Sequence, residues 1–283
     1  MTRDLFSGDA GDVTHPWRRL KRTLGEAAFE AVDRALLTRA RVDRLARTQA
    51  PLQVLVTGVY RSGSLLPRAV ERLRSERHDV RFAFGAVGPA DARLASETVV
   101  ERLSGGKFEN VNRALAAAAP AAAHSHWILV VDDDVRLPPR FLDRFLALCE
   151  RFQLELAQPA QSQRSHSAWR VTRRRPASLV RETRFVEIGP LTAFGRRTGE
   201  LLPFPELRYG WGLDLHWAAL AAERGWRLGV VDATPVRHES ALVGSAYRLS
   251  DAEAEATGFL ATRPFLPAER ASEVVAVHRR AGR

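Results

Sequence analysis

The chain has 283 residues, 45% of them hydrophobic and 27% charged, which suffices for one large core and excludes a disordered chain. Its single cysteine, Cys149, excludes an internal disulfide, so we expect a buried thiol and a fold compatible with a reducing compartment. The net charge of +10 fits either a solvated basic surface or affinity for polyanions. Without a signal-like apolar stretch or a run of about 18 apolar residues, we expect a cytoplasmic protein, or one peripheral at the inner membrane face.

The first 48 residues predict a frayed tail followed by a basic helical extension. From Pro16 to about Arg47 many arginines accompany apolar residues spaced by three and four: Trp17, Leu20, Leu24, Ala28, Val32 and Leu36. This spacing predicts an amphipathic helix or helix pair. Such a stripe usually packs on its own domain, and the alternative is a peripheral contact with a membrane surface.

Residues 49–248 alternate between strand and helix patterns, which predicts one α/β domain with parallel strands. The predicted strands cover 52–58, 80–85, 127–131, 154–157, 185–194 and 226–231, and the predicted helices cover 65–74, 108–118, 141–152 and 213–224. Residues 249–283 predict a helical tail, with Ser250 and Glu253 as a capping box. Between Gln161 and Pro176 a polar, arginine-rich segment interrupts this alternation of strands and helices, and it predicts a mobile or ligand-facing loop that acts as a lid.

The most informative segment is the apolar strand 127–131, which runs directly into Asp132, Asp133 and Asp134. Adjacent carboxylates repel one another unless a cation compensates. The carboxyl end of a strand in an open α/β sheet faces the ligand crevice, and Mg²⁺ or Mn²⁺ prefers oxygen ligands. A metal site is therefore favoured over the alternative that the aspartates cap the following turn.

The triplet and the following Leu137-Pro138-Pro139 resemble the Asp-x-Asp segment of glycosyltransferases with the GT-A fold, including family 2-like enzymes. The resemblance implies a mixed sheet flanked by helices and a divalent metal that holds a nucleotide diphosphate. It implies that Asp132 meets the donor ribose or the metal and that Asp134 ligates the metal. Asp133, at the variable middle position, is also placed among the donor-binding residues.

Two upstream segments are similar to donor-binding pieces of the same fold. Lys107 and Asn110 open the helix before the acidic strand, where a lysine and a helix N-terminus both favour anions. Thr57 and Arg61 follow the first strand, in the loop that commonly contacts base and diphosphate in GT-A enzymes. Ordinary surface turns explain both segments nearly as well.

Two downstream segments complete the predicted site. The glycines and aromatics of 209–212 allow a close turn against a flat ligand, and Asp214 follows at a helix start. Asp214 is either an N-cap or, by the resemblance, the catalytic base of an inverting enzyme. His238 follows the last predicted strand, where many GT-A enzymes place a further metal ligand, although a lone histidine is more often structural.

The stretch from Trp127 to Glu239 also resembles the DUF707 group of glycosyltransferase-like proteins, in its acidic triplet, its basic His-containing loop and Trp211-Gly212-Leu213-Asp214. This resemblance implies that Glu187 faces the acceptor. No acidic residue ends the second strand, where many relatives hold uracil, so the donor base stays open.

We therefore expect a metal-dependent glycosyltransferase that moves a sugar from a nucleotide-diphosphate-sugar to the hydroxyl of a glycan, a lipid-linked or a small-molecule acceptor, inverting by direct displacement. The alternatives are a nucleotidyltransferase, which also uses clustered aspartates, and a non-enzymatic polyanion binder. Nucleic acid is not an expected partner, because the aromatic residues do not interleave with a basic run.

Overall fold

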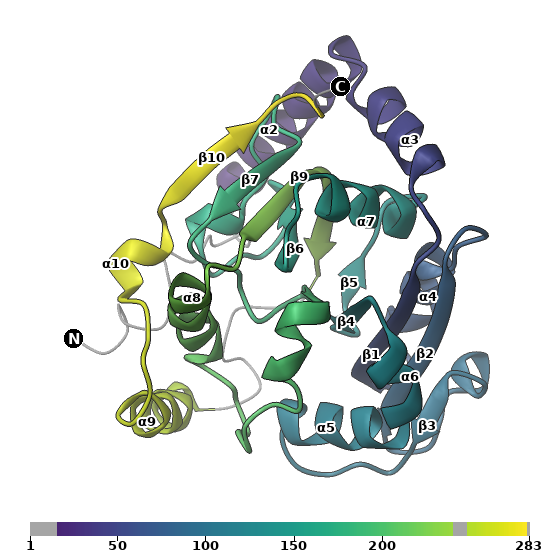
Figure 1. The fold of residues 1–283 in the computed structure, drawn as a ribbon, viewed down its shortest axis with the longest axis vertical. Coiled ribbons are helices and arrows are strands. Elements are labelled where there is room, and N and C mark those ends of the chain that lie inside the picture. The colour runs from purple at the N-terminus through teal and green to yellow at the C-terminus, as the bar shows by residue number, and fades with distance from the viewer. Residues whose placement is uncertain (1–15, 240–247, 282–283) are drawn as a thin grey trace.

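The computed structural model describes residues 16–239 and 248–281, and Figure 1 shows their arrangement. Two N-terminal helices, α2 (Pro16–Ala35) and α3 (Thr38–Thr48), precede the sheet. The strands that follow are β1 (Gln53–Arg61), β2 (Asp79–Val87), β3 (Thr98–Val100), β4 (Trp127–Val131), β5 (Val135–Arg136), β6 (Leu156–Gln161), β7 (Val180–Thr183), β8 (Leu191–Gly195), β9 (Leu228–His238) and β10 (Val274–His278). The connecting helices are α4 (Leu66–Leu73), α5 (Lys107–Ala117), α6 (Ala119–His124), α7 (Phe141–Arg151), α8 (Leu213–Arg224), α9 (Leu249–Leu260) and α10 (Ala268–Ala271).

The strands form one mixed sheet in the order β10-β7-β9-β6-β8-β4-β1-β2-β3. From β4 to β3 neighbouring strands are parallel, while β8 runs antiparallel between β4 and β6. β9 pairs in parallel with β6, and its far end also pairs with the two-residue β5, placing Val135 opposite His238. The segment just after β4 is thereby held against the carboxyl end of β9.

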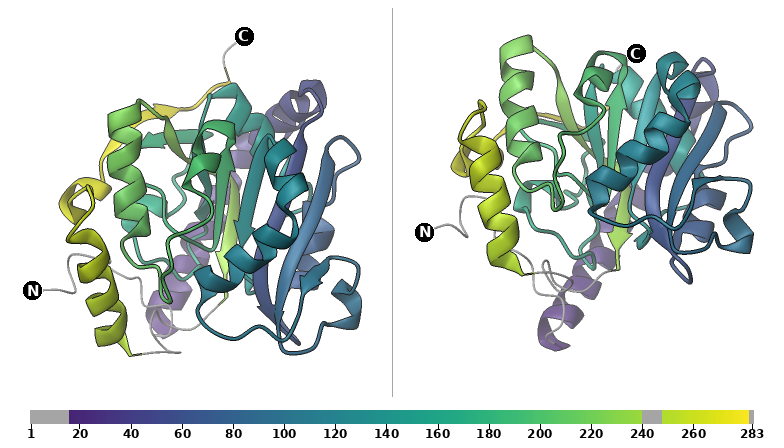
Figure 2. Two further views of the ribbon diagram at one scale, coloured as in Figure 1. Left: turned by 60° about the horizontal axis from the view of Figure 1, so that its bottom comes forward. Right: turned by 90° about the horizontal axis from the view of Figure 1, so that it is seen from below.

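Helices cover both faces of the sheet, as Figures 1 and 2 show. On one face, α3, α4 and α7 bury a core that includes Phe141, Phe145 and Cys149. On the other face, α5, α8 and α9 bury a second core that includes Phe108, Trp217 and Phe259. The thiol of Cys149 is fully buried as expected, and burial raises its pKa well above the usual range.

The predicted alternation of strands and helices is confirmed. The differences lie in segments whose structure depends on pairing with strands far away in the sequence. Of the expected strand over 185–194, only the last part forms a strand, β8 (Leu191–Gly195), and the additional strand β7 (Val180–Thr183) lies before it. The tail predicted as helical ends in β10, which pairs antiparallel with β7. The predicted capping box at Ser250 is wrong: the N-cap of α9 is Arg248, which makes no side-chain cap.

Helix α2 packs on the domain, but not through its apolar stripe. Its buried side chains are acidic, Glu26 and Asp33, and the stripe predicted to face the core is turned to solvent. Within the part of the chain that the structure describes, none of the helices combines the length and apolar character needed to cross a membrane.

Candidate metal centre and its surroundings

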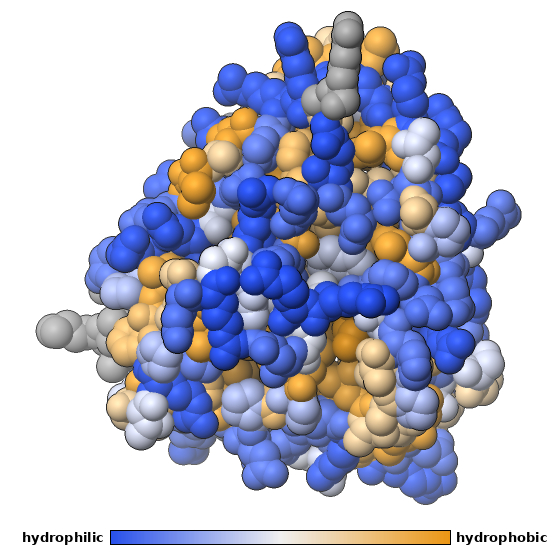
Figure 3. Space-filling model, in the orientation of Figure 1, coloured by the Kyte–Doolittle hydropathy of each residue, from blue (hydrophilic) through white to orange (hydrophobic). Residues whose placement is uncertain are grey.

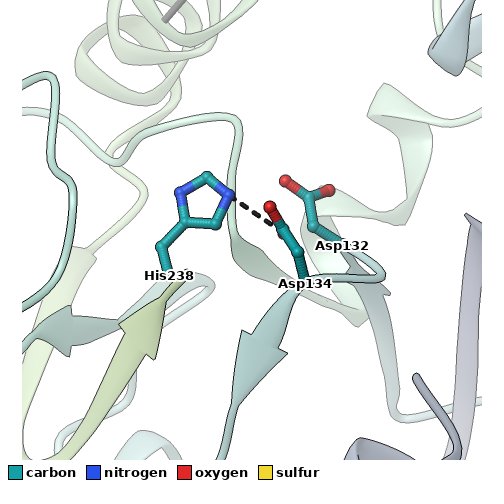
Figure 4. Close-up of side chains that lie close together, drawn as sticks. All are labelled: Asp132, Asp134 and His238. Atoms are coloured by element: carbon teal, nitrogen blue, oxygen red, sulfur yellow. Dashed lines mark ion pairs between the residues drawn. The ribbon is translucent and has the colours of Figure 1, made fainter. Parts of the chain in front are cut away.

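Asp132, Asp134 and His238 converge at the carboxyl ends of β4 and β9 (Figure 4). One ligand atom of each residue lies within 4.8 Å of the others, and His238 Nε2 is 3.0 Å from Asp134 Oδ1. The β5–β9 pairing explains the convergence, because it sets the residue after Asp134 directly across from His238. The backbone N–H of Glu239 also donates to the carbonyl of Asp134, which fixes the two segments together.

This donor set suits a divalent cation. Two carboxylates and one imidazole are hard and borderline ligands that Mn²⁺ accepts at about 2.0–2.3 Å, so ligand atoms around one ion lie about 3–4.5 Å apart. The observed spread of up to 4.8 Å needs only a small side-chain adjustment. The three side chains are all partly exposed, so an ion could enter from solvent.

The two carboxylates of the centre each have a basic partner, Lys107 for Asp132 and His238 for Asp134. Burial lowers the pKa of His238, but the hydrogen bond to Asp134 and the nearby carboxylates outweigh burial and raise it overall. Lys107 Nζ lies 2.5 Å from Asp132 Oδ1, so one end of the cluster already holds a positive charge. Gly189 approaches the same carboxylate so closely that an added Cβ would lie 2.8 Å from Asp132 Oδ2.

Asp133 points away from the other two aspartates. Its Oδ2 accepts a hydrogen bond of 2.9 Å from the backbone N–H of Arg61, and its carbonyl accepts one from Leu65. Burial raises the pKa of Asp133, and the neighbouring aspartates add to the rise. The middle aspartate therefore ties the end of β1, where the exposed Arg61 lies, to the loop after β4.

Two residues predicted to contact the donor lie elsewhere. Thr57 is fully buried, and its hydroxyl donates to the carbonyl of Ala83 on β2, so this side chain belongs to the sheet core and reaches no ligand. Asn110 is buried too, and its Oδ1 accepts from Arg113 one helical turn onward. We leave both out of the candidate site. Lys107 remains in it through its contact with Asp132.

Asp214 lies at the first turn of α8 and is buried, 5% exposed. Burial raises the pKa of Asp214 to about 8, and the charge of Glu187 adds to the rise. Its Oδ1 accepts from the backbone N–H of Leu215 at 2.9 Å. The turn before it is closely packed: Gly210 has a φ of 76°, and a Cβ there would lie 2.0 Å from the Phe108 ring. The glycine-rich turn is therefore built against the protein's own aromatic core.

Glu187 links Asp214 to the metal centre. The N–H of the next residue, Ile188, donates to the Asp214 carboxyl, while the Glu187 carboxyl accepts from Gln161 Nε2 at 2.9 Å. Burial raises the pKa of Glu187 to about 7, although the positive charge on His238 opposes the rise. Glu187 thus interacts with the candidate ligands His238 and Asp132 on one side and with Asp214 on the other.

His166 is a residue of this site that the sequence pattern did not single out. It is 4% exposed, its ring centroid lies 6.2 Å from that of His238, and neither ring nitrogen has a hydrogen-bond partner among the described residues. Burial lowers its pKa, and the neighbouring His238 and arginines add to this. The sequence feature that could have identified His166 as a site residue is its position in a basic, His-containing loop.

Much of the arginine-rich segment 161–176, predicted as a mobile or ligand-facing lid, packs against the rest of the domain. Arg174 is buried and forms ion pairs with Glu26 and Asp33 of α2. Arg173 donates to Ser167 Oγ. Only the exposed arginines of the segment remain free to meet a ligand: Arg164, Arg170 and Arg175.

Comparison with known proteins bears on the fold. No protein-family model matches the chain, and no curated protein matches it in sequence. Its fold is similar to that of the crystal structure of GalNAc-T7 with UDP, GalNAc and Mn²⁺, with a TM-score of 0.50 and 11% identity over 68% of this chain. The chain spans 45% of the length of that protein. The predicted fold class, a GT-A-like mixed sheet flanked by helices, is confirmed.

Proposed function

We propose that this chain is a metal-dependent glycosyltransferase that uses a nucleotide-diphosphate-sugar donor. The observation that carries the proposal is the convergence of Asp132, Asp134 and His238 at the strand ends of a GT-A-like fold. A protein of similar fold was crystallised with UDP, GalNAc and Mn²⁺. At this position in an open α/β sheet, ligands bind beyond the carboxyl ends of the strands.

Asp134 and His238 would hold the metal, with Asp132 as a third ligand or as a partner of the donor ribose. When bound, a divalent cation supplies positive charge that offsets the nucleotide diphosphate and its growing charge as leaving group. Lys107 adds a cationic group next to Asp132, and the loop that carries Arg61 is tied to the same acidic segment through Asp133. Together the metal ligands and Lys107 would orient a polyanionic donor over the centre.

Asp214 is the group we assign as the base. In direct displacement the acceptor hydroxyl oxygen bonds to the anomeric carbon while the bond from that carbon to the diphosphate oxygen breaks. The hydroxyl proton passes to the Asp214 carboxylate, and the nucleotide diphosphate leaves with the bonding electrons. The reaction inverts the anomeric carbon because attack and departure occur on opposite faces. With its pKa raised to about 8, Asp214 must lose its own proton before it can act.

A thermal-shift screen of nucleoside diphosphates and their sugars, with and without Mn²⁺, tests the proposal. A specific donor raises the melting temperature by mass action, and only when Mn²⁺ is present. Asp134→Ala should lose the metal-dependent part of this shift. Asp79→Ala is the matched control, because Asp79 is exposed at the opposite, amino end of β2. A Mn²⁺-dependent shift that survives Asp134→Ala would exclude this metal site.

A further inference from the structure

Helix α2 carries an apolar face that the other described residues leave exposed, and we call it the outer face of α2. It comprises six exposed residues of the helix and the turn after it: Trp17 (75% exposed), Leu20 (50%), Leu24 (62%), Val32 (38%), Leu36 (45%) and Leu37 (66%). The hydrophobic residues on the view of Figure 3 lie in small, separate patches. The outer face of α2 is instead one continuous stripe along a single element.

Buried ion pairs on the side of α2 that faces the domain fix the orientation of the helix. Arg174 forms ion pairs with Glu26 and Asp33, and all three side chains are nearly or fully buried. Glu26 Oε2 also accepts a hydrogen bond of 2.6 Å from the backbone N–H of Gln163. Rotating α2 to bury its stripe would leave Arg174 and both carboxylates without partners, which is strongly unfavourable. The stripe is therefore exposed as a consequence of the native packing.

The charges beside the stripe select its partner. Three of the four acidic residues of α2 and α3 are committed to ion pairs: Glu26 and Asp33 to Arg174, and Asp43 to Arg140 and Arg144. The fourth, Glu30, is half-buried. The exposed charged residues of α2 and α3 are basic, namely Arg19, Lys21, Arg34, Arg39, Arg44 and Arg47. An apolar stripe flanked by cations complements an anionic lipid surface. A second copy of the chain would instead bring cations against cations.

We propose that the outer face of α2 docks on an anionic bilayer. Trp17, Leu20 and Leu24 enter the boundary between headgroups and acyl chains, and the basic side chains meet the lipid phosphates. Tryptophan at the end of the stripe suits this boundary, because its ring is apolar and its N–H polar. This inference is independent of the proposed transferase activity, since it rests on α2, α3 and the ion pairs that hold them, and not on the candidate metal ligands.

Vesicle flotation with the full chain tests the proposal. Vesicles of phosphatidylcholine are compared with vesicles that also contain phosphatidylglycerol, at low and high salt. The wild type should float with the anionic vesicles, less so at high salt. The double variant Leu20→Ser/Leu24→Ser should bind at least about tenfold more weakly, because the apolar part of the contact is lost.

The matched control is Val99→Ser/Val275→Ser, which removes two exposed apolar residues (41% and 59% exposed) away from α2 and should float like the wild type. Circular dichroism verifies that both variants fold. If Leu20→Ser/Leu24→Ser floats as well as the wild type, the interaction is a nonspecific charge attraction and the proposal is overturned. Failure of the wild type to bind anionic vesicles would overturn it too. So would a concentration-dependent dimer in sedimentation that the same double variant abolishes, since the stripe would then belong to a second copy.

Discussion

Replacing Asp214 with Asn should stabilise the fold while it abolishes sugar transfer. The unfolded carboxyl has its pKa near 3.8, and burial raises the folded value to about 8. At pH 7 the folded state therefore carries a proton that the unfolded state has released. Each pH unit above 3.8 costs the folded state about 1.4 kcal/mol, so the penalty at pH 7 is roughly 4 kcal/mol. An Asn side chain has the shape of the protonated acid and avoids this penalty.

The sign of the pH dependence follows from the raised folded pKa. The contribution of Asp214 to stability is complete below pH 3.8 and is lost progressively as the pH rises through about 8. Urea unfolding of the wild type and Asp214→Asn should give equal stabilities near pH 4, and the advantage of the variant should grow steadily toward pH 7. The control Asp79→Asn alters an exposed carboxyl and should show no such trend. An Asp214→Asn variant that is less stable than the wild type at pH 7 would refute the reasoning.

Three further outcomes are expected. Arg174→Met should destabilise the fold by roughly 3–5 kcal/mol in urea unfolding, because two buried carboxylates lose their cation; a change below about 1 kcal/mol would show that the ion pairs are not formed. Gly189→Ala should weaken Mn²⁺ binding at least about tenfold, since the added Cβ would lie 2.8 Å from Asp132 Oδ2. In the control Gly199→Ala the added Cβ meets open space, so this variant should bind Mn²⁺ like the wild type. The rate of transfer should rise with pH up to about 8, as the base Asp214 loses its proton, and a rate that falls over this range would exclude that role.

The convergence of the candidate metal ligands was predictable because each of them lies at the end of a predicted strand. A buried strand followed by three aspartates fixes where Asp132 and Asp134 lie, and the order of strands places His238 at the same sheet edge. The short β5–β9 pairing that completes the centre has no sequence signature, because two residues carry it. The fully buried Thr57 was misplaced because β1 continues to Arg61, so Thr57 lies in the middle of the strand and its side chain faces the sheet core rather than a loop.

The packing of α2 could not be predicted from its own residues. Its periodicity correctly predicts a helix, but the inward face is chosen by Arg174, which lies more than 140 residues from both of its partners. The apolar stripe alone favours the opposite orientation. β10 is similar, since its place in the sheet depends on an antiparallel register with β7, about 90 residues away.

The most direct test of the account is to count bound Mn²⁺ by electron paramagnetic resonance in the wild type, in His238→Ala and in the control His216→Ala. The imidazole of His216 is engaged with the carbonyl of Pro264, so its loss leaves the candidate centre intact. We predict one Mn²⁺ per chain in the wild type and in His216→Ala, strengthened by a nucleoside diphosphate, and at least about tenfold weaker binding in His238→Ala. Equal Mn²⁺ affinity in His238→Ala and the wild type would contradict the centre on which the proposed function depends.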